Sequence, residues 1–404
     1  MTRGIGGSDL QTVLASFQNR TADMVPIQGA EHKTRLEQAT ALLQANDLAA
    51  IYLHAGANLL YFTGMKWKPS ERMVGALLTA SGQLQYIGPA FEAGTIKSFM
   101  KVDAPLQCWE EHESPAQLLG AMLKDAGIPD GRIAVDESVP FFISESLRAT
   151  NPSYELVDAT PVTAGCRMCK SEAEIALIQR AKDITLAVQK AAARIMHPGI
   201  AAKTVIDFIN EAHIRSGIAA GSYFCTVLFG EDTQYPHGVP APQPLQNNDV
   251  VLVDTGCQLH GYISDITRTY VYGTPTARQR EIWQLEKAAQ LAAFDAAQPG
   301  ATCASVDDAA RRALEAAGLG PDYKLPGLPH RTGHGTGLEI HEHPYLVRSD
   351  QTPLQKGMVL SVEPMICVPG AFGIRHEDHF YMTKTGPRWF TQPMPSLEAP
   401  FSNA

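Results

Sequence analysis

The sequence lacks the features of a membrane, secreted or nucleic-acid-binding protein. No segment of the 404 residues approaches the run of about 20 apolar residues that a membrane span requires. The opening stretch MTRGIGGSDLQTVLASFQNR contains no continuous apolar core of signal-peptide length. The formal net charge of -9 gives no excess of positive charge for nucleic acid or an anionic membrane. We therefore expect a soluble, cytoplasmic protein with neither of these partners.

Cysteine is scarce and does not form a recognisable framework. The chain has seven cysteines, an odd number, which is typical of reduced thiols in a cytosolic protein. Cys166 and Cys169 form a single CxxC pair, but a metal or redox role needs a second pair or a thioredoxin-like context, and the sequence has neither. We interpret the cysteines as small buried packing residues.

The composition and length indicate a globular protein of two domains. Hydrophobic residues make up 45% of the chain and charged residues 19%, which is ordinary for a protein with a sizeable core. After a weakly patterned arm over residues 1–30, helix and strand patterns alternate to about residue 160 and predict an α/β first domain over 1–165. In the second domain, 166–404, Ser171 and Glu174 form a capping-box signature before a helical stripe.

Carboxylates stand at the ends of strand-like runs in the second domain. The apolar run 250–253 ends on Asp254, and a second β-rich run carries Asp265. Glu363 ends another apolar run, and FGIRHEDHFYMT alternates strictly as one strand. Alternation places Arg375, Glu377 and His379 on one face of that strand and His376 and Asp378 on the other.

Four carboxylates in one core need compensating charge. An unpaired buried carboxylate costs several kcal/mol, and only Arg268 and Arg375 supply fixed cations within these runs. Two divalent metal ions would balance the four negative charges. Oxygen donors with one imidazole, His334, suit Mn²⁺, Co²⁺, Fe²⁺ or Zn²⁺. Two such ions about 3.5–4 Å apart activate water near neutral pH. We interpret the nearby His237 and His341 as groups that would contact the substrate.

The order of these residues resembles a known family. Asp254, Asp265, His334, Glu363 and Glu377, with the flanking VDTG, SDITRT, GHGTG, VEP and RHED, match the five-ligand signature of the metal-dependent pita-bread peptidases. That family includes methionine aminopeptidases, aminopeptidase P and Xaa-Pro dipeptidases (prolidases). Residues of about 35–165, including NLLYFTG at 58–64, resemble the creatinase-type N-terminal domain. The resemblance implies an α/β (α+β) chain with this domain followed by a pita-bread catalytic domain.

The resemblance also implies a role for each residue of the signature. Asp254 would bind one metal ion, Asp265 and Glu377 would bridge two ions, and His334 and Glu363 would complete the second site. Glu363 would also transfer the catalytic proton.

Further residues match positions outside the five ligands. His237 and His341 match catalytic histidines that contact substrate, and His330 matches a pocket histidine. Arg375 matches an arginine that supports a ligand carboxylate, and Arg348 lies near the place of the arginine that grips the C-terminal carboxylate in prolidases.

One residue departs from the family pattern. Relatives commonly have a tyrosine four residues after the glutamate of VEP, and Cys367 stands there instead. The tyrosine hydroxyl helps to hold the tetrahedral intermediate, so its absence predicts lower turnover or another residue in that role.

The resemblance favours an Xaa-Pro dipeptidase with two metal ions per chain, Mn²⁺ first among them. Its substrate would be a small peptide with proline in second position, and its assembly a homodimer. Three alternatives remain open: an Xaa-Pro aminopeptidase, a lyase or C–N hydrolase acting on a small zwitterion, and a binding module without activity. The five intact ligands argue against the last of these.

Overall fold

The computed structural model describes residues 2–401, which form two compact units. One unit is Pro26–Arg167. The other combines the N-terminal segment up to Val25 with the chain from Met168 onward, and it contains every candidate site residue.

The Pro26–Arg167 unit is built on a mixed six-stranded sheet in the order β4-β3-β2-β1-β5-β6. Strand β1 is buried along its whole length, pairs with β2 antiparallel and with β5 parallel, and so forms the centre of this sheet. The elements are α2 (Gly29–Ala45), β1 (Ala50–His54), α3 (Ala57–Thr63), β2 (Gly75–Thr79), β3 (Leu84–Pro89), η1 (Ala90–Glu92), α4 (Ala93–Phe99), β4 (Leu106–Trp109), α5 (Pro115–Asp125), β5 (Gly131–Val135), α6 (Phe141–Thr150), β6 (Tyr154–Asp158) and α7 (Thr160–Arg167).

The second unit contains two principal antiparallel sheets. One has the order β10-β8-β7 with β9 paired to β8, the other has the order β12-β11-β13-β16-β17, and β14 pairs with β15. The elements are α1 (Leu10–Ala15), α8 (Glu172–Arg194), α9 (Ala202–Arg215), β7 (Ser222–Phe229), η2 (Gly230–Gln234), β8 (Val250–Leu259), β9 (Tyr262–Ile263), β10 (Ile266–Val271), α10 (Ala277–Ala296), α11 (Cys303–Ala316), β11 (Gly333–Gly335), β12 (Glu342–Leu346), β13 (Val359–Val362), β14 (Met365–Val368), β15 (Phe372–Arg375), β16 (Asp378–Thr383) and β17 (Gly386–Trp389).

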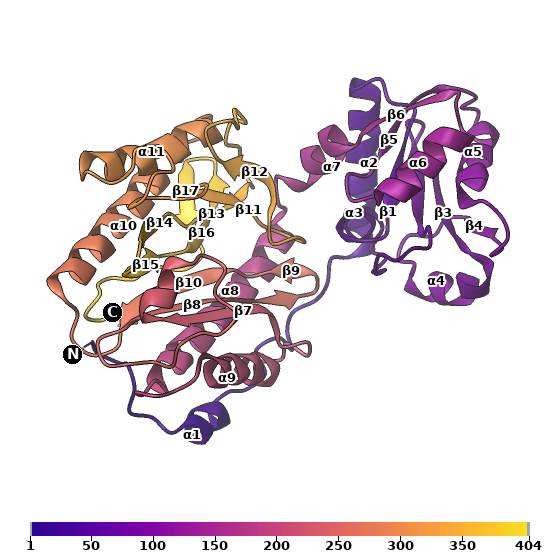
Figure 1. The fold of residues 1–404 in the computed structure, drawn as a ribbon. Coiled ribbons are helices and arrows are strands. Elements are labelled where there is room, and N and C mark those ends of the chain that lie inside the picture. The colour runs from indigo at the N-terminus through magenta and orange to yellow at the C-terminus, as the bar shows by residue number, and fades with distance from the viewer. Residues whose placement is uncertain (1, 402–404) are drawn as a thin grey trace. The chain divides into compact units, whose positions relative to one another are not determined.

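Two pairs of helices cover these sheets. Helices α8 and α9 pack against β8 and β7, whereas α10 and α11 pack against the strands that follow them in sequence (Figure 1). Strands β8 and β13 and the first half of β16 carry almost entirely buried side chains, as is typical of strands covered on both faces. Polar side chains on these strands therefore lie in the interior of the unit.

The structure confirms the expected capping box and corrects one strand. Ser171 accepts a hydrogen bond from the Glu174 amide, and the Glu174 carboxylate accepts one from the Ser171 amide, at the start of α8. The stretch FGIRHEDHFYMT, expected to be one strand, is two: β15 ends at Arg375 and β16 begins at Asp378. The predicted alternation of faces still holds, since Arg375 and Glu377 both bond to Thr267.

Among residues 2–401, no helix is both long enough and apolar enough to cross a membrane.

Candidate metal centre

The β8–β10 pair brings the first two carboxylates together. Asp254 lies in the middle of β8, opposite Thr267 of the antiparallel strand β10. Asp265 lies immediately before β10 and its side chain is buried. Gly256 allows the chain to return closely, because a Cβ there would lie 1.8 Å from the Ser264 carbonyl oxygen.

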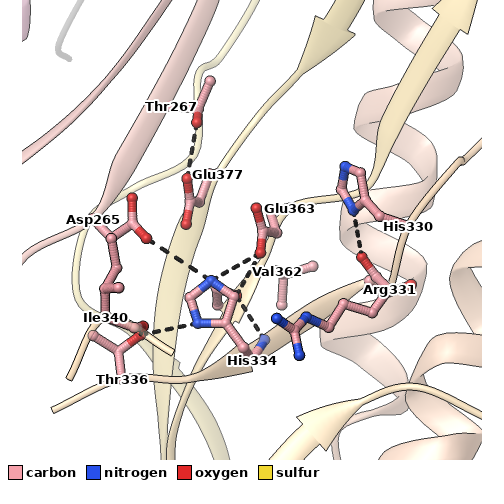
Figure 2. A network of polar contacts seen from close by, with 12 residues as sticks. Asp265, Thr267, His330, Arg331, His334, Thr336, Ile340, Val362, Glu363 and Glu377 are labelled. Atoms are coloured by element: carbon pink, nitrogen blue, oxygen red, sulfur yellow. Dashed lines mark hydrogen bonds and ion pairs between the residues drawn. The ribbon is translucent and has the colours of Figure 1, made fainter. Parts of the chain in front are cut away.

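The second sheet supplies a histidine and a glutamate. His334 lies in β11, and Glu363 follows the neighbouring strand β13. The His334 amide donates a 2.8 Å hydrogen bond to Ser361 Oγ, which fixes this crossing of the strands. Gly333 is needed there, since a Cβ would lie 2.0 Å from the Ser361 carbonyl oxygen. The close packing places His334 Nε2 at 2.9 Å from Glu363 Oε1 (Figure 2).

Glu377 lies in the break between β15 and β16. Its Oε2 accepts a 2.8 Å hydrogen bond from the hydroxyl of Thr267, and its amide donates to the Thr267 carbonyl oxygen at 3.1 Å. The break in the strand thus places the Glu377 backbone and carboxylate against one residue of β10.

These side chains converge with unused polar atoms. Single ligand atoms of Asp265, His334 and Glu377 all lie within 4.8 Å of one another. Asp265 Oδ2 is 3.8 Å from His334 Nε2 (Figure 2). Buried oxygens without a hydrogen-bond partner include Oδ1 of Asp254, Oδ1 of Asp265 and Oε1 of Glu377. Unpaired buried polar atoms are rare and costly, so this cluster fits cations held among them.

The carboxylates of the cluster resist ionisation together. Burial raises the pKa of Asp265 to about 7, with a further contribution from the negative charge of Asp254. Burial likewise raises the pKa of Asp254, which the Arg375 guanidinium partly opposes. The pKa of Glu377 is raised well above its usual value by burial and by the charge of Asp265. A positive charge at this position would reverse these shifts.

Glu363 is the exception among the four carboxylates. Burial works against its ionisation, but the charge and hydrogen bond of His334 outweigh burial and hold the pKa of Glu363 below its usual value. In the same pair, burial lowers the pKa of His334, yet the Glu363 charge prevails and the pKa is raised. Glu363 is therefore the carboxylate that stays ionised most readily.

Arg375 supports two sides of the cluster. Its Nη2 donates a 2.6 Å hydrogen bond to Asp254 Oδ2, and its Nε donates to the Thr267 hydroxyl at 3.0 Å. Both Arg375 and Asp254 side chains are largely buried. This arrangement orients the Asp254 carboxylate and the hydroxyl that bonds to Glu377.

The histidines outside the ligand set lie at the edge of the cluster. The His341 ring meets the His334 ring edge-on with centroids 4.3 Å apart, and burial lowers the pKa of His341 to about 4. His330 Nδ1 lies 2.7 Å from the Arg331 carbonyl oxygen, and its Nε2 is buried without a partner. Burial also lowers the pKa of His330, and the charge of the exposed His237 makes a small further contribution to the lowered pKa values of His330 and His341.

Arg348 pairs with acidic side chains. Its guanidinium is bound by three carboxylates, those of Asp308 at 2.8 Å, Glu315 at 3.8 Å and Asp322, and its side chain is 40% exposed. The partners that the structure gives Arg348 are thus carboxylates of α11 and of the loop after it.

Sequence reasoning gave no role to two residues that shape the cluster. Thr267 bonds to both Glu377 and Arg375. Lys182 of α8 is fully buried, and its ammonium donates to the Asp265 carbonyl oxygen at 3.2 Å. A signal existed for Thr267, because residues two apart in a strand share a face and Thr267 follows Asp265 at that spacing. Lys182 is contributed by a distant helix, which a local pattern does not reveal.

Two sequence profiles match this chain. Residues 176–384 match the profile of metallopeptidase family M24, and residues 35–169 match that of the creatinase/prolidase N-terminal domain. Together the profiles cover most of both compact units.

Curated relatives are similar over nearly their whole length. The putative dipeptidase YkvY of Bacillus subtilis is 32% identical over 359 residues, covering 89% of this chain and 97% of the relative. The Xaa-Pro dipeptidase of Lactobacillus delbrueckii subsp. lactis is 29% identical over 366 residues, covering 90% and 98%.

Solved structures share the fold. The dipeptidase PepE from Mycobacterium ulcerans superposes with a TM-score of 0.86 at 32% identity, covering 93% of this chain and 100% of that one. A recombinant prolidase from Thermococcus sibiricus gives a TM-score of 0.80 at 25% identity, covering 89% and 97%.

Proposed function

This chain belongs to metallopeptidase family M24, and from that premise we propose that it is an Xaa-Pro dipeptidase, which hydrolyses the bond before proline in dipeptides. Membership confirms the resemblance, the creatinase-type domain followed by a pita-bread domain, and the class of hydrolase. The observation that carries the proposal is the convergence of buried ligand atoms from Asp265, His334 and Glu377, with an unpartnered oxygen on each of the two carboxylates. The relatives with dipeptidase and prolidase activity in their names support the substrate class.

The family implies a divalent metal, and we propose two ions per chain. Asp254, Asp265 and Glu377 would hold one ion, and Asp265, Glu377, His334 and Glu363 the other. Two ions would satisfy the unpartnered atoms and balance the four carboxylates. The oxygen-rich donor set with one imidazole favours Mn²⁺, with Co²⁺, Zn²⁺ and Fe²⁺ as further candidates. When bound, the ions activate a water molecule and polarise the scissile carbonyl.

The residues around the ions would transfer the proton and contact the substrate. Glu363, the most readily ionised carboxylate, would accept a proton from the attacking water and return it to the proline nitrogen that leaves. His341 and His237 would donate hydrogen bonds to the substrate carbonyl as negative charge develops on it. His330 has a free, buried Nε2 and would contact the substrate as a pocket group.

A substrate panel tests the proposed function. The purified protein, loaded with Mn²⁺, is assayed on Ala-Pro, Ala-Pro-Ala and Ala-Ala, with elemental analysis of the same sample. We expect hydrolysis of Ala-Pro in preference to the other two peptides, at close to two ions per chain. Preferred cleavage of Ala-Pro-Ala would identify an Xaa-Pro aminopeptidase instead. Full activity at a content that never exceeds one ion would contradict the two-ion site.

We also propose a homodimer in the cytoplasm, with a functional division between residues 1–165 and 166–404. The family resemblance supports the dimer and the division, and the seven cysteines, none in a disulfide, support a reducing compartment. Sedimentation analysis of the full chain tests the dimer.

A further inference from the structure

Two buried glutamines of the second unit contact the backbone beside the candidate metal ligands. Gln189 lies in α8 with 1% of its surface exposed, and Gln290 lies in α10 with 0% exposed. A buried side-chain amide costs free energy unless it is hydrogen-bonded, so its partners indicate what the residue does. In both glutamines the amide nitrogen faces carbonyl oxygens of residues that are next to ligands in the sequence.

Gln189 joins the two strands that carry the aspartates. Its Nε2 donates to the Val253 carbonyl oxygen at 3.0 Å and to the Ile266 carbonyl oxygen at 2.8 Å. Val253 directly precedes Asp254 in β8. Ile266 directly follows Asp265 and begins β10. Both partners are acceptors, so both hydrogens of this one amide are used, and the side chain fixes the two strands relative to each other beside the aspartates.

The same face of α8 bonds to the chain around Asp265. Lys182, Thr185 and Gln189 are spaced three and four residues apart, which places them on one face of the helix. Lys182 donates to the Asp265 carbonyl oxygen, and the Thr185 hydroxyl lies 2.8 Å from that of Ser264. Asp265 lies between β9 and β10, so these contacts supplement the strand pairing at this residue.

Gln290 has the same relation to the two glutamate ligands. Its Nε2 lies 3.2 Å from Asp378 Oδ2, 3.4 Å from the His376 carbonyl oxygen and 3.5 Å from the Val362 carbonyl oxygen. The last two residues directly precede the two glutamates in the sequence. Glu286, one turn earlier in α10, accepts a 3.1 Å hydrogen bond from the His376 amide. Helices α8 and α10 thus each bond to the strands against which they pack (Figure 1).

We propose that Gln189 and Gln290 are positioning residues of the metal centre, one for each half of its ligands. The inference rests on the proposed function, because it assumes the two-ion site. A metal ion holds its donors within about 0.2 Å of the preferred distances, so a carboxylate can bind only when the backbone behind it is in place. Gln189 sets the spacing of the two aspartates, and Gln290 sets that of the two glutamates. Both act through the backbone of the ligand residues rather than by touching an ion.

Methionine substitutions test these roles, because they remove the amide and keep the length of the side chain. Isothermal titration calorimetry measures Mn²⁺ affinity of the metal-free full chain in wild type, Gln189→Met, Gln290→Met and Gln279→Met. Gln279 is the matched control. It is also buried, and its Nε2 donates at 3.0 Å to the carbonyl oxygen of Asn248, which is not next to a ligand in the sequence.

Loss of a supporting bond lowers metal affinity by about 10- to 100-fold. We expect that loss in Gln189→Met and in Gln290→Met, and wild-type affinity in Gln279→Met. Electron paramagnetic resonance of the Mn²⁺-loaded protein distinguishes a coupled pair of ions from isolated ions. The coupled signal should persist in Gln279→Met and should weaken in the other two variants.

The thermal unfolding midpoint of each metal-free variant separates positioning from general stability. Unchanged affinity in Gln189→Met or in Gln290→Met would overturn the role of that glutamine. An equal loss of affinity in Gln279→Met would overturn both roles, because it would follow from the loss of any buried amide. If Gln189→Met does not fold, Gln189→Glu replaces it, since a buried carboxyl stays protonated and keeps one donor. Affinity between wild type and a 100-fold loss then supports the role, and wild-type affinity overturns it.

Assays of Ala-Pro on the same preparations separate this proposal from the function on which it rests. If the wild type binds two Mn²⁺ ions and the two glutamine variants bind them more weakly, but no dipeptide is cleaved, the dipeptidase fails and the positioning roles stand. If Ala-Pro is cleaved and all variants bind Mn²⁺ as the wild type does, only the positioning roles fail. If the wild type binds no Mn²⁺, both proposals fail.

Discussion

The hydroxyl of Thr267 donates a 2.8 Å hydrogen bond to Glu377 Oε2, and this contact directs the other oxygen of Glu377 toward Asp265 and His334. The same hydroxyl accepts a hydrogen bond from Arg375 Nε. A neutral, fully buried side chain therefore joins the carboxylate of β15–β16 to the arginine that holds Asp254.

Replacing Thr267 by valine should weaken the metal site while preserving the shape of the side chain. Valine offers no donor, so the Glu377 carboxylate is no longer oriented and Arg375 Nε loses its acceptor. Losses of such supporting bonds cost about 10- to 100-fold in metal affinity or activity. Isothermal titration calorimetry with Mn²⁺ measures the change in metal affinity. Thr267→Ser, which retains the hydroxyl, should stay near wild type, and an equal loss in both variants would contradict this role.

Asp265→Ala and Glu377→Ala should each abolish hydrolysis and lower the metal content. Both side chains contribute to the cluster of atoms within 4.8 Å, so neither ion would keep its full set of donors. Elemental analysis and Ala-Pro turnover measure the two effects in one preparation. Asp295→Ala, which removes an exposed carboxylate of α10, serves as the control. Near-normal turnover in either cluster variant would mean that its carboxylate is not a shared ligand.

His341→Ala should be slow yet keep its metal ions. Its ring contacts that of His334, and we place it on the substrate, so its removal should take away a hydrogen bond to the transition state and leave the metal donors in place. Such a loss typically lowers kcat by about 10²–10³. Comparing kcat with metal content shows whether His341 contacts the substrate or binds a metal ion. Loss of ions along with rate would make His341 a ligand.

Cys367→Tyr tests the departure from the family pattern. Cys367 is 3% exposed, and its thiol donates to the Gln234 carbonyl oxygen at 3.2 Å. A tyrosine ring at this buried position must displace its neighbours, and such overpacking costs about 1–3 kcal/mol. We expect a lower thermal unfolding midpoint with unchanged metal content. An unchanged midpoint together with a higher kcat would show that the site has room for the hydroxyl.

Metal-free protein should lose stability as the pH rises from about 4 to 7. The pKa of Asp265 is raised from 3.8 to about 7 by burial, so the folded state holds this proton more tightly than the unfolded state does. The free energy of unfolding therefore falls with rising pH wherever the folded state binds more protons than the unfolded state. Urea unfolding at several pH values measures the slope. Asp265→Asn, which cannot ionise, should flatten it, and Mn²⁺ should restore stability at pH 7. A slope unchanged by Asp265→Asn would rule out Asp265 as its source.

The sequence by itself determined which residue types meet at this site. Alternation along a strand is a local property, so it placed Arg375 and Glu377 on one face even though the strand is broken between them. The need to balance buried charge then pointed to divalent metals. The helix start at Ser171 was equally local, because a capping box depends on residues three apart.

Only the tertiary structure decided which basic side chains pair with which acidic groups. Arg348 and Arg331 both lie near the histidine motif in sequence, yet α11 and the loop after it bring carboxylates to Arg348, whereas Tyr345 brings an uncharged ring to Arg331. In the same way, Lys182 reaches Asp265 from a helix more than eighty residues away in sequence. Such pairings depend on strand register and on helix packing between distant segments, which no local pattern contains.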